Sequence, residues 1–267
     1  MSRIGLVAGH GKLPIIFAKA AKESGETVIA FALKGVTQED LAGYVDKIHW
    51  LEWGNFQKAL LLLATERIKR IVMLGKIDKE ILFKGDEKLD DKARSMLKKT
   101  GDRKDYPILK GVAGILGKLG IEVMDSTTYL KDLIPSKGVL TKREPTKEEW
   151  EDIAYGKDVA RELSRFDIGQ TLAVKDKTVI ALEAIEGTDE TIKRAGELTS
   201  VGFSVIKVAR PNQDMRFDVP LIGPDTLKHL IAANGKVLAL EEGKTLLMDK
   251  EEMIKLADEK GVSIVVI

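Results

Sequence analysis

The stretch that decides the fold is residues 3–25, RIGLVAGHGKLPIIFAKAAKESG. It begins with an apolar run typical of a buried strand, and the glycine turn GHGKLP follows directly. Pro14 suits the first turn of a helix, and Gly25 suits the cap that ends it. The order strand, glycine turn, helix predicts an α/β fold, and such a turn offers backbone N–H groups to a phosphate.

This turn does not complete a dinucleotide-binding fingerprint. Gly9 and Gly11 are present, but Pro14 stands where the third glycine is expected, and no acidic residue ends the next strand, TVIAFAL. We therefore disfavour a nicotinamide cofactor. A tight turn that binds no ligand is the alternative to a phosphate site, because such turns occur throughout α/β folds.

Strand and helix patterns repeat outward from this stretch and predict a doubly wound, Rossmann-like domain over residues 1–130. Residues 131–145 lack periodicity and carry two prolines, which is typical of a linker. A second α/β domain with a mixed sheet is predicted over residues 146–267, opening with a capping box from Thr146 to Glu149. We expect the ligand in a cleft between the two domains.

Two hairpins are predicted in the second domain. They are TLAVKDKTVIALEAIEG at residues 171–187 and KVLALEEGKTLLM at residues 236–248. The first ends in an acidic turn that contains Glu183, Glu186 and Asp189 and leads through Gly187 and Thr188 into a helix. A capped helix N-terminus is the alternative reading of this turn, since acids and threonine are common there.

Composition restricts the chemistry. The 267 residues carry a formal net charge of +1, which gives no support for a nucleic-acid surface. There is no cysteine, and no two of the three histidines have metal-ligand spacing, so any metal is held mainly by carboxylates, which favours Mg²⁺, Mn²⁺ or Ca²⁺. No apolar run approaches the roughly 20 residues of a membrane span, and the N-terminus is unlike a signal peptide. We expect a cytoplasmic protein.

Residues 207–223, KVARPNQDMRFDVPLIG, form the second informative stretch. A strand should end near its start and a helix should begin after it, which places the loop where open α/β sheets bind ligands. Asp214 and Asp218, with Lys207, Arg210 and Arg216 nearby, suit a metal ion and a phosphate. An exposed, charged connecting loop is the alternative.

The residues as a whole favour metal-assisted hydrolysis of a phosphate ester or anhydride. The chain has no Ser-His-Asp order, no Walker A loop and no cysteine nucleophile. A non-catalytic protein that binds a nucleotide or lipid is the alternative from another class.

Three segments together, GLVAGHGKLP, ALEAIEGTDE and KVARPNQDMRFDVPLIG, resemble the UDP-2,3-diacylglucosamine pyrophosphatase family of lipid A biosynthesis, in the form distinct from the calcineurin-like enzyme. The resemblance covers nearly the whole chain. Its most specific part is the run Gln-Asp-x-Arg-x-Asp-x-Pro-x-Ile-Gly, which starts at Gln213. The segments GKIDKEIL and TGDRKDYPIL of the first half match only loosely.

The resemblance implies a hydrolase that needs Mg²⁺ or Mn²⁺ and adds water to the α-phosphate of a lipid-linked UDP-sugar. The products are UMP and 2,3-diacylglucosamine 1-phosphate (lipid X). It implies that one aspartate of this run is essential, as a metal ligand or as the group that activates water. Asp218 is the first candidate and Asp214 is the second. Hydrolysis of another nucleotide-diphosphate sugar is the alternative within enzymes. Transient contact with the inner membrane surface and a homodimer are left open.

The resemblance also implies the remaining site residues. The metal ligands would be Asp218, Asp214, Glu183, Glu186 and Asp189, and the substrate contacts would be Gly9, Gly11, Lys12, Gly187, Thr188, Lys207, Gln213 and Arg216.

Overall fold

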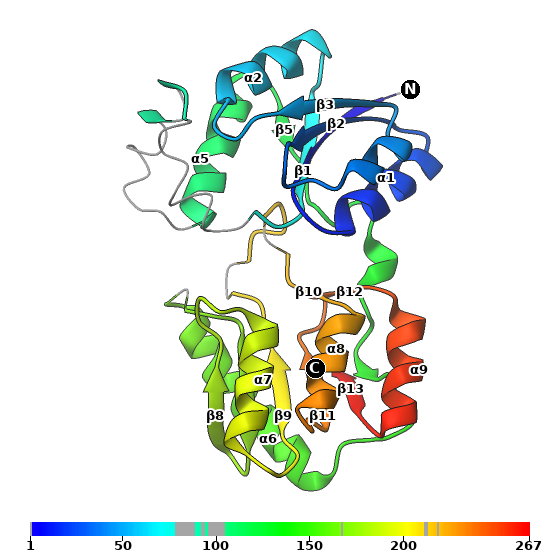
Figure 1. Cartoon of the computed structure of the whole chain (residues 1–267), viewed down its shortest axis with the longest axis vertical. Helices are drawn as coiled ribbons and strands as arrows, with labels where there is room; N and C mark the ends of the chain where they lie inside the picture. Colours follow the sequence, from blue (N-terminus) through cyan, green and yellow to red (C-terminus); the bar gives the residue numbers. More distant parts are fainter. Residues whose placement is uncertain are drawn as a thin grey trace. The chain divides into compact units, whose positions relative to one another are not determined.

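The computed structural model describes residues 2–77, 89–91, 94–95, 105–166, 168–210, 213–217 and 219–267. The chain divides into two compact units (Figure 1). The first unit is Met1–Lys131 together with Asp214–Asp218, and the second is Asp132–Gln213 together with Val219–Ile267. Both units are α/β, as the sequence predicts. A short segment of the loop at residues 207–223 thus belongs to the first unit although its neighbours in sequence belong to the second.

The first unit is built on a five-stranded parallel sheet of order β3-β2-β1-β4-β5. The helix α1 packs against β1 and β2, and its buried side includes Phe17 and Ala21. The helices α2 and α5 supply Leu63, Ala113 and Leu116 to the core on the other face. The doubly wound arrangement is therefore confirmed. The elements are β1 (Arg3–Ala8), α1 (Leu13–Glu23), β2 (Thr27–Leu33), the 3₁₀ turn η1 (Glu39–Gly43), β3 (Lys47–Leu51), α2 (Phe56–Thr65), β4 (Arg70–Leu74), α5 (Asp105–Lys118) and β5 (Glu122–Val123).

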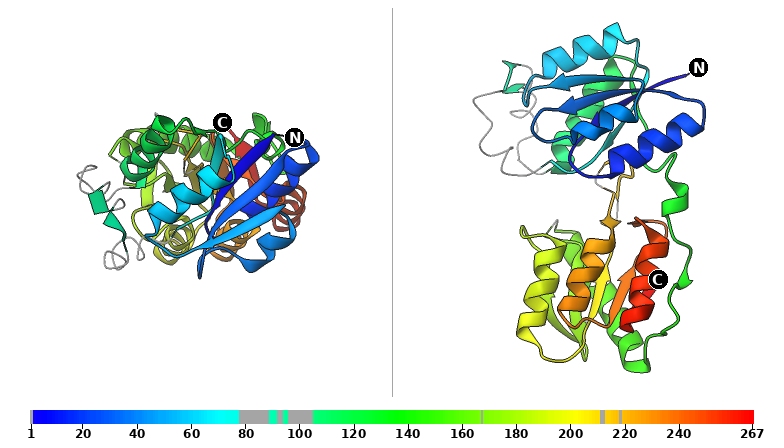
Figure 2. Two further views of the ribbon diagram at one scale, coloured as in Figure 1. Left: turned by 90° about the horizontal axis from the view of Figure 1, so that it is seen from above. Right: turned by 45° about the vertical axis from the view of Figure 1, so that its right-hand side comes forward.

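The second unit is built on a six-stranded mixed sheet of order β6-β13-β11-β9-β7-β8. Its strands β9, β11 and β13 run parallel, whereas β6, β7 and β8 pair antiparallel with their neighbours. The helix α6 covers one face, and α7, α8 and α9 cover the other (Figure 2). The elements are η3 (Lys131–Leu133), β6 (Gly138–Val139), α6 (Lys147–Ser164), β7 (Thr171–Lys175), β8 (Thr178–Leu182), α7 (Thr188–Leu198), β9 (Ser204–Lys207), β10 (Leu221–Ile222), α8 (Pro224–Ala232), β11 (Val237–Leu240), β12 (Leu246–Leu247), α9 (Lys250–Lys260) and β13 (Ser263–Val266).

The structure confirms two of the local predictions for the second half and differs from a third. The capping box is confirmed, because Thr146 accepts from the backbone of Glu149 while the Glu149 carboxylate accepts from the backbone of Thr146. The first hairpin, β7–β8, is confirmed, with Asp176 and Lys177 in the left-handed region that such a turn requires. Residues 131–145, expected as a linker, include β6, which pairs with β13.

The second predicted hairpin is wrong. The strand β12 does not return along β11 and instead pairs in parallel with β10 in a separate two-stranded sheet. The reason is that β11 already has β9 on one side and β13 on the other, so it has no free edge for a hairpin partner. In the part of the chain that the structure describes, no helix has the length and apolarity needed to cross a membrane.

Candidate functional site

A buried lysine marks the carboxyl-end edge of the second unit's sheet. Lys207 is the last residue of β9 and is only 6% exposed. Its Nζ donates to Thr188 Oγ1 at 2.7 Å and to Thr171 Oγ1 at 3.2 Å. No carboxylate of the described residues forms an ion pair with it. Because a buried charge with only neutral partners is costly, this ammonium group is suited to an anionic ligand.

Strand pairing and a helix start bring the hydroxyl partners to Lys207. Thr171 begins β7 and lies directly opposite Lys207 in the antiparallel β7–β9 register. Thr188 is the first residue of α7, whose N-cap Gly187 has φ +85° and provides no side-chain cap. The first backbone N–H groups of α7 therefore lie beside Lys207, and a helix N-terminus also favours an anion.

Glu183 is held in the same hydrogen-bond network. Thr188 Oγ1 accepts from Lys207 and donates to Glu183 Oε1 at 3.1 Å, and the backbone N–H of Gln170 donates to Glu183 Oε2 at 3.2 Å. The structure therefore brings together Lys207, Gly187, Thr188 and Glu183 from the predicted set. Thr171 was missed because only the strand register places it opposite Lys207, and Gln170 because only its backbone contact with Glu183 identifies it.

The other two acids of the turn have partners of their own. Glu186 accepts from Arg194 at 2.8 Å and from the backbone of Ala184 at 3.1 Å. Backbone N–H groups, first its own and then that of Ala184, lower the pKa of Glu186 below its ordinary value, against the effect of burial. Asp189 accepts from Thr226 at 2.8 Å. Neither acid caps α7, whose N-terminus has no side-chain cap, so these contacts do not match the helix-capping alternative.

Asp214 and Arg216 lie in the first unit and bind each other. Arg216 donates through Nε to Asp214 Oδ1 at 2.9 Å and through a terminal nitrogen to Oδ2 at 2.7 Å, which is a bidentate pair. The Arg216 guanidinium holds the pKa of the Asp214 carboxyl below its usual value. Gln213 is the last residue of the second unit before this segment, and its backbone N–H donates to Arg210 at 3.0 Å.

This pairing predicts how acid affects stability. Since the folded-state pKa of Asp214 is lowered, the pair stabilises the fold above the unfolded pKa of about 4 and loses that contribution as the pH falls through the folded pKa. We expect Asp214→Asn to lower the unfolding free energy near neutral pH by less than about 1 kcal/mol, because Arg216 is partly exposed. The melting temperature should fall with it. The difference from wild type should shrink between about pH 5 and about pH 2, as calorimetry would measure.

The control is Glu162→Gln, which removes an exposed carboxylate on α6 and should leave the pH dependence unchanged. A difference between wild type and Asp214→Asn that stays constant down to the acid limit would contradict the ion pair.

The segment Asp214–Asp218 is anchored by two residues that sequence analysis did not select. Phe217 is 1% exposed and packs in the first unit's core with Phe31 and Ile71. The Ser126 N–H donates to Met215 O at 2.9 Å, and its hydroxyl lies 3.0 Å from the carbonyl of Arg216. Asp218, the residue on which the prediction rests most, lies outside the described residues.

The predicted glycine turn after β1 is joined to the loop after β4. The Gly9 N–H donates to Leu74 O at 2.7 Å, and His10 exchanges two backbone hydrogen bonds with Lys76, of 2.8 and 2.9 Å. A Cβ on Gly9 would lie 2.7 Å from Lys76 O, so close backbone packing alone explains this glycine. Gly11 has open space around it at φ +105°, and Lys12 is exposed.

No group of three or more Asp, Glu or His residues in the described ranges is placed to hold a metal ion. Asp214, Glu186 and Asp189 are each paired as given above, and Glu183 faces Thr188. The metal ligands therefore stay a prediction.

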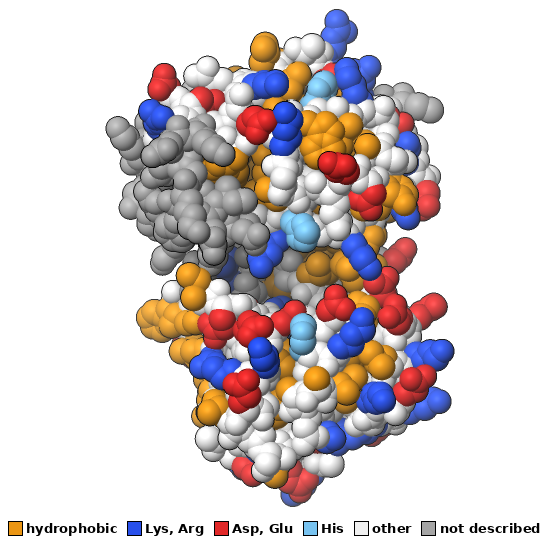
Figure 3. Space-filling view, viewed as in Figure 1, with side chains coloured by type: hydrophobic (Ala, Val, Ile, Leu, Met, Phe, Trp, Pro, Cys, Tyr) orange, Lys and Arg blue, Asp and Glu red, His pale blue; other side chains and the backbone are white. Residues whose placement is uncertain are grey.

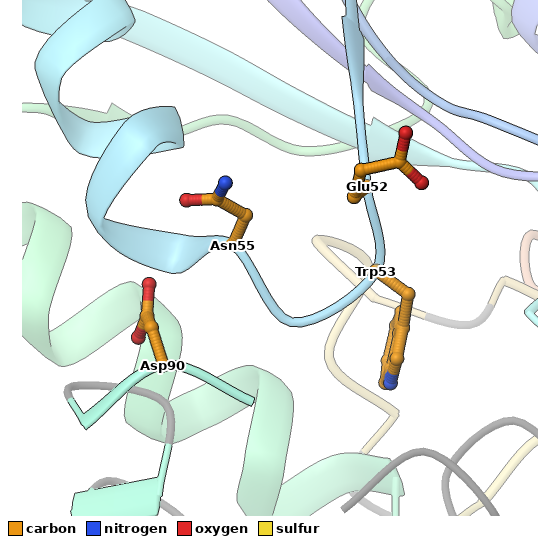
Figure 4. A pocket seen from close by; sticks show the side chains of 4 residues that line it. All are labelled: Glu52, Trp53, Asn55 and Asp90. Atoms are coloured by element: carbon orange, nitrogen blue, oxygen red, sulfur yellow. The ribbon is translucent and has the colours of Figure 1, made fainter. Parts of the chain in front are cut away.

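One hollow of about 490 Å³ lies in the first unit and is lined by Glu52, Trp53, Asn55 and Asp90 (Figure 4). Two of these side chains cap α2: Asn55 accepts from the backbone of Lys58 at 3.2 Å, and Asp90 accepts from that of Gln57 at 2.6 Å. None of the predicted site residues lines this hollow.

Solved structures give only a weak likeness. The chain resembles a biotin carboxylase from Campylobacter jejuni with 11% identity, a TM-score of 0.29 and coverage of 73% of this chain and 41% of that one. It resembles phosphoribosylglycinamide synthetase from Anaerococcus prevotii with 15% identity, a TM-score of 0.26 and coverage of 74% and 43%. The chain thus spans about two fifths of the length of these structures.

Sequence comparison is informative over the whole length. The chain is 29% identical to the UDP-2,3-diacylglucosamine pyrophosphatase LpxI of Caulobacter vibrioides over 273 residues, covering 98% of this chain and 96% of that protein. The model of the LpxI N-terminal domain matches residues 3–133, and that of the LpxI C-terminal domain matches residues 136–265. The two models meet where the sequence changes from one α/β pattern to the next, and the chain belongs to the LpxI family.

Proposed function

We propose that this protein hydrolyses the pyrophosphate bond of UDP-2,3-diacylglucosamine, with water attacking the α-phosphate to give UMP and 2,3-diacylglucosamine 1-phosphate. Its family supports the reaction and the substrate. The structural observation that supports it most is the buried Lys207 ammonium, which has hydroxyl partners and no ion-pair partner among the described residues. A pyrophosphate would supply the missing negative charge.

In this proposal the site stabilises charge that develops on phosphate oxygens. An ammonium group has three N–H donors, and two of those of Lys207 point to Thr171 and Thr188, which leaves the third for a phosphate oxygen. Glu183 accepts from Thr188 and so fixes which way that hydroxyl points. Donors held in place before reaction need no rearrangement in the transition state, which is the main source of electrostatic catalysis.

We assign Asp218 the activation of water, on the family resemblance and the motif that carries it. Arg216 would contact the pyrophosphate by exchanging its pairing with Asp214 for phosphate oxygens.

We also propose a requirement for Mg²⁺ or Mn²⁺, which the family resemblance and the absence of cysteine support. The described carboxylates do not by themselves fit such an ion, because no three of them are placed together to hold it. When bound, a divalent ion would neutralise phosphate charge and lower the pKa of a bound water.

The test is turnover of UDP-2,3-diacylglucosamine by the purified full chain in detergent micelles. We expect release of UMP, its loss with EDTA and its return with Mg²⁺ or Mn²⁺. Hydrolysis in ¹⁸O-labelled water should place the label in UMP, because attack is at the α-phosphate. Label in the sugar phosphate would contradict the assigned phosphorus.

Two results would favour the alternatives. Tight retention of the substrate without turnover under any divalent ion would identify a binding protein. Equal turnover of an unacylated UDP-sugar would identify a hydrolase that does not recognise the lipid.

A further inference from the structure

Three large apolar side chains lie exposed on two loops of the second unit. Phe166 is 70% exposed and Ile168 is 44% exposed, and both lie between α6 and β7. Ile185 is 78% exposed and lies between β8 and α7. We call these three residues the apolar tip. Figure 3 shows hydrophobic side chains gathered at the left-hand margin of this unit.

The two loops lie side by side because they extend the β7–β8 pairing. The Glu183 N–H donates to Thr171 O at 2.9 Å, and the Gln170 N–H donates to the Glu183 carboxylate at 3.2 Å. A Cβ on Gly169 would lie 2.0 Å from Glu183 O, so the two backbones are in direct contact there. The loops that carry the three apolar side chains are therefore in contact through their backbones.

The apolar tip lies on the same two loops as residues that surround Lys207. Ile185 lies between Glu183 and the α7 N-cap Gly187, and Ile168 comes shortly before Thr171, which binds Lys207. The same two loops thus carry exposed apolar groups and the polar groups that hold the ammonium in place. Exposed apolar clusters of this kind mark binding surfaces more often than isolated surface residues do.

We propose that the apolar tip receives an acyl chain of the substrate whose pyrophosphate binds at Lys207. This rests on the proposed function. A diacylated nucleotide-sugar joins an anionic group to long apolar chains, so the protein surfaces for the two must be contiguous. The apolar tip lies on the two loops that also carry residues of the anion site. Burying the tip against an acyl chain removes apolar area of both partners from water.

The test compares substrates that differ only in acyl length. We expect Ile185→Ser and Phe166→Ser each to lower kcat/KM for the long-chain substrate by about tenfold, chiefly through KM, and to leave kcat/KM for the diacetyl analogue unchanged. The side chains are exposed, so folding should be unaffected. Leu198→Ser and Val201→Ser are the matched controls, because these residues are 63% and 51% exposed at the other end of α7.

Three results would overturn the proposal: no change with either substrate, an equal loss with both, or the same selective loss in the controls. Sedimentation with substrate-free phosphatidylglycerol vesicles tests whether the tip binds a lipid bilayer and not an acyl chain of the substrate. If wild type binds these vesicles and the tip variants do not, while micellar kinetics are unchanged, the tip contacts the bilayer instead.

Failure of the proposed function is a distinct outcome. If wild type hydrolyses neither substrate, the reaction is refuted, and equilibrium binding of uncleaved UDP-2,3-diacylglucosamine decides on the tip. Equal affinity of wild type and Ile185→Ser would then overturn it, whereas selectively weaker binding by the variant would support it.

Discussion

Replacing Lys207 with methionine is expected to lower kcat/KM by about a thousandfold and, at the same time, to make the protein more stable. The activity falls because the ammonium group is the buried cation that faces the proposed pyrophosphate, and a preorganised donor of this kind is worth about two to three orders of magnitude. Stability rises because a buried ammonium group whose direct partners are neutral hydroxyls is replaced by an apolar side chain of similar length.

The gain in unfolding free energy should be about 1–3 kcal/mol. After the change, Thr171 and Thr188 can still bond to each other, since their hydroxyl oxygens lie 3.3 Å apart. The measurements are steady-state UMP release and urea denaturation. Lys193→Met is the matched control, because this lysine is exposed on α7 and should change neither quantity.

Two outcomes would contradict this reading of Lys207. Loss of both activity and stability would show that the lysine has a structural role. Unchanged activity would show that the site does not bind the reacting phosphate.

The second large effect is expected from Phe217→Ala, which should lower the unfolding free energy by about 3–5 kcal/mol. Phe217 is 1% exposed and packs with residues from β2, α2, β4 and α5, so its removal leaves a cavity in the first unit's core. The hydrogen bonds from Ser126 to the carbonyls of Met215 and Arg216 would remain. Urea denaturation of the full chain measures the loss, with a separate transition where the units unfold independently.

Two matched variants sharpen this test. Phe166→Ala removes the same side chain from a site that is 70% exposed, so it should change stability by less than about 0.5 kcal/mol. Asp218→Asn, one residue further along the chain, should abolish turnover with unchanged stability. A loss below about 1 kcal/mol for Phe217→Ala would show that the segment is not anchored by this side chain.

The features that sequence predicts well are local. The residue pattern of 3–25 is enough to predict its strand, glycine turn and helix. The Thr146 capping box depends on two residues that are three positions apart. The β7–β8 hairpin is equally local. The second hairpin failed because the sequence of β12 cannot show that both edges of β11 are occupied.

The residues of the candidate site also differ in whether the sequence alone can identify them. Lys207, Thr188 and Glu183 are each conspicuous in sequence and do come together. Thr171 is an ordinary strand residue until the register places it opposite Lys207. Phe217 lies in a charged stretch and gives no local sign that its partners are more than 90 residues earlier in the chain.

The placement of Asp214–Asp218 also constrains how the protein is made. On the ribosome, the first unit's sheet is complete once β5 has emerged, but its core lacks Phe217 until most of the second unit has been synthesised. At about 5–20 residues per second, translation of the residues between β5 and Phe217 takes about 5–20 s. During that time the first unit's core lacks the Phe217 side chain, so the folding of this unit is completed only after residue 217 has been synthesised.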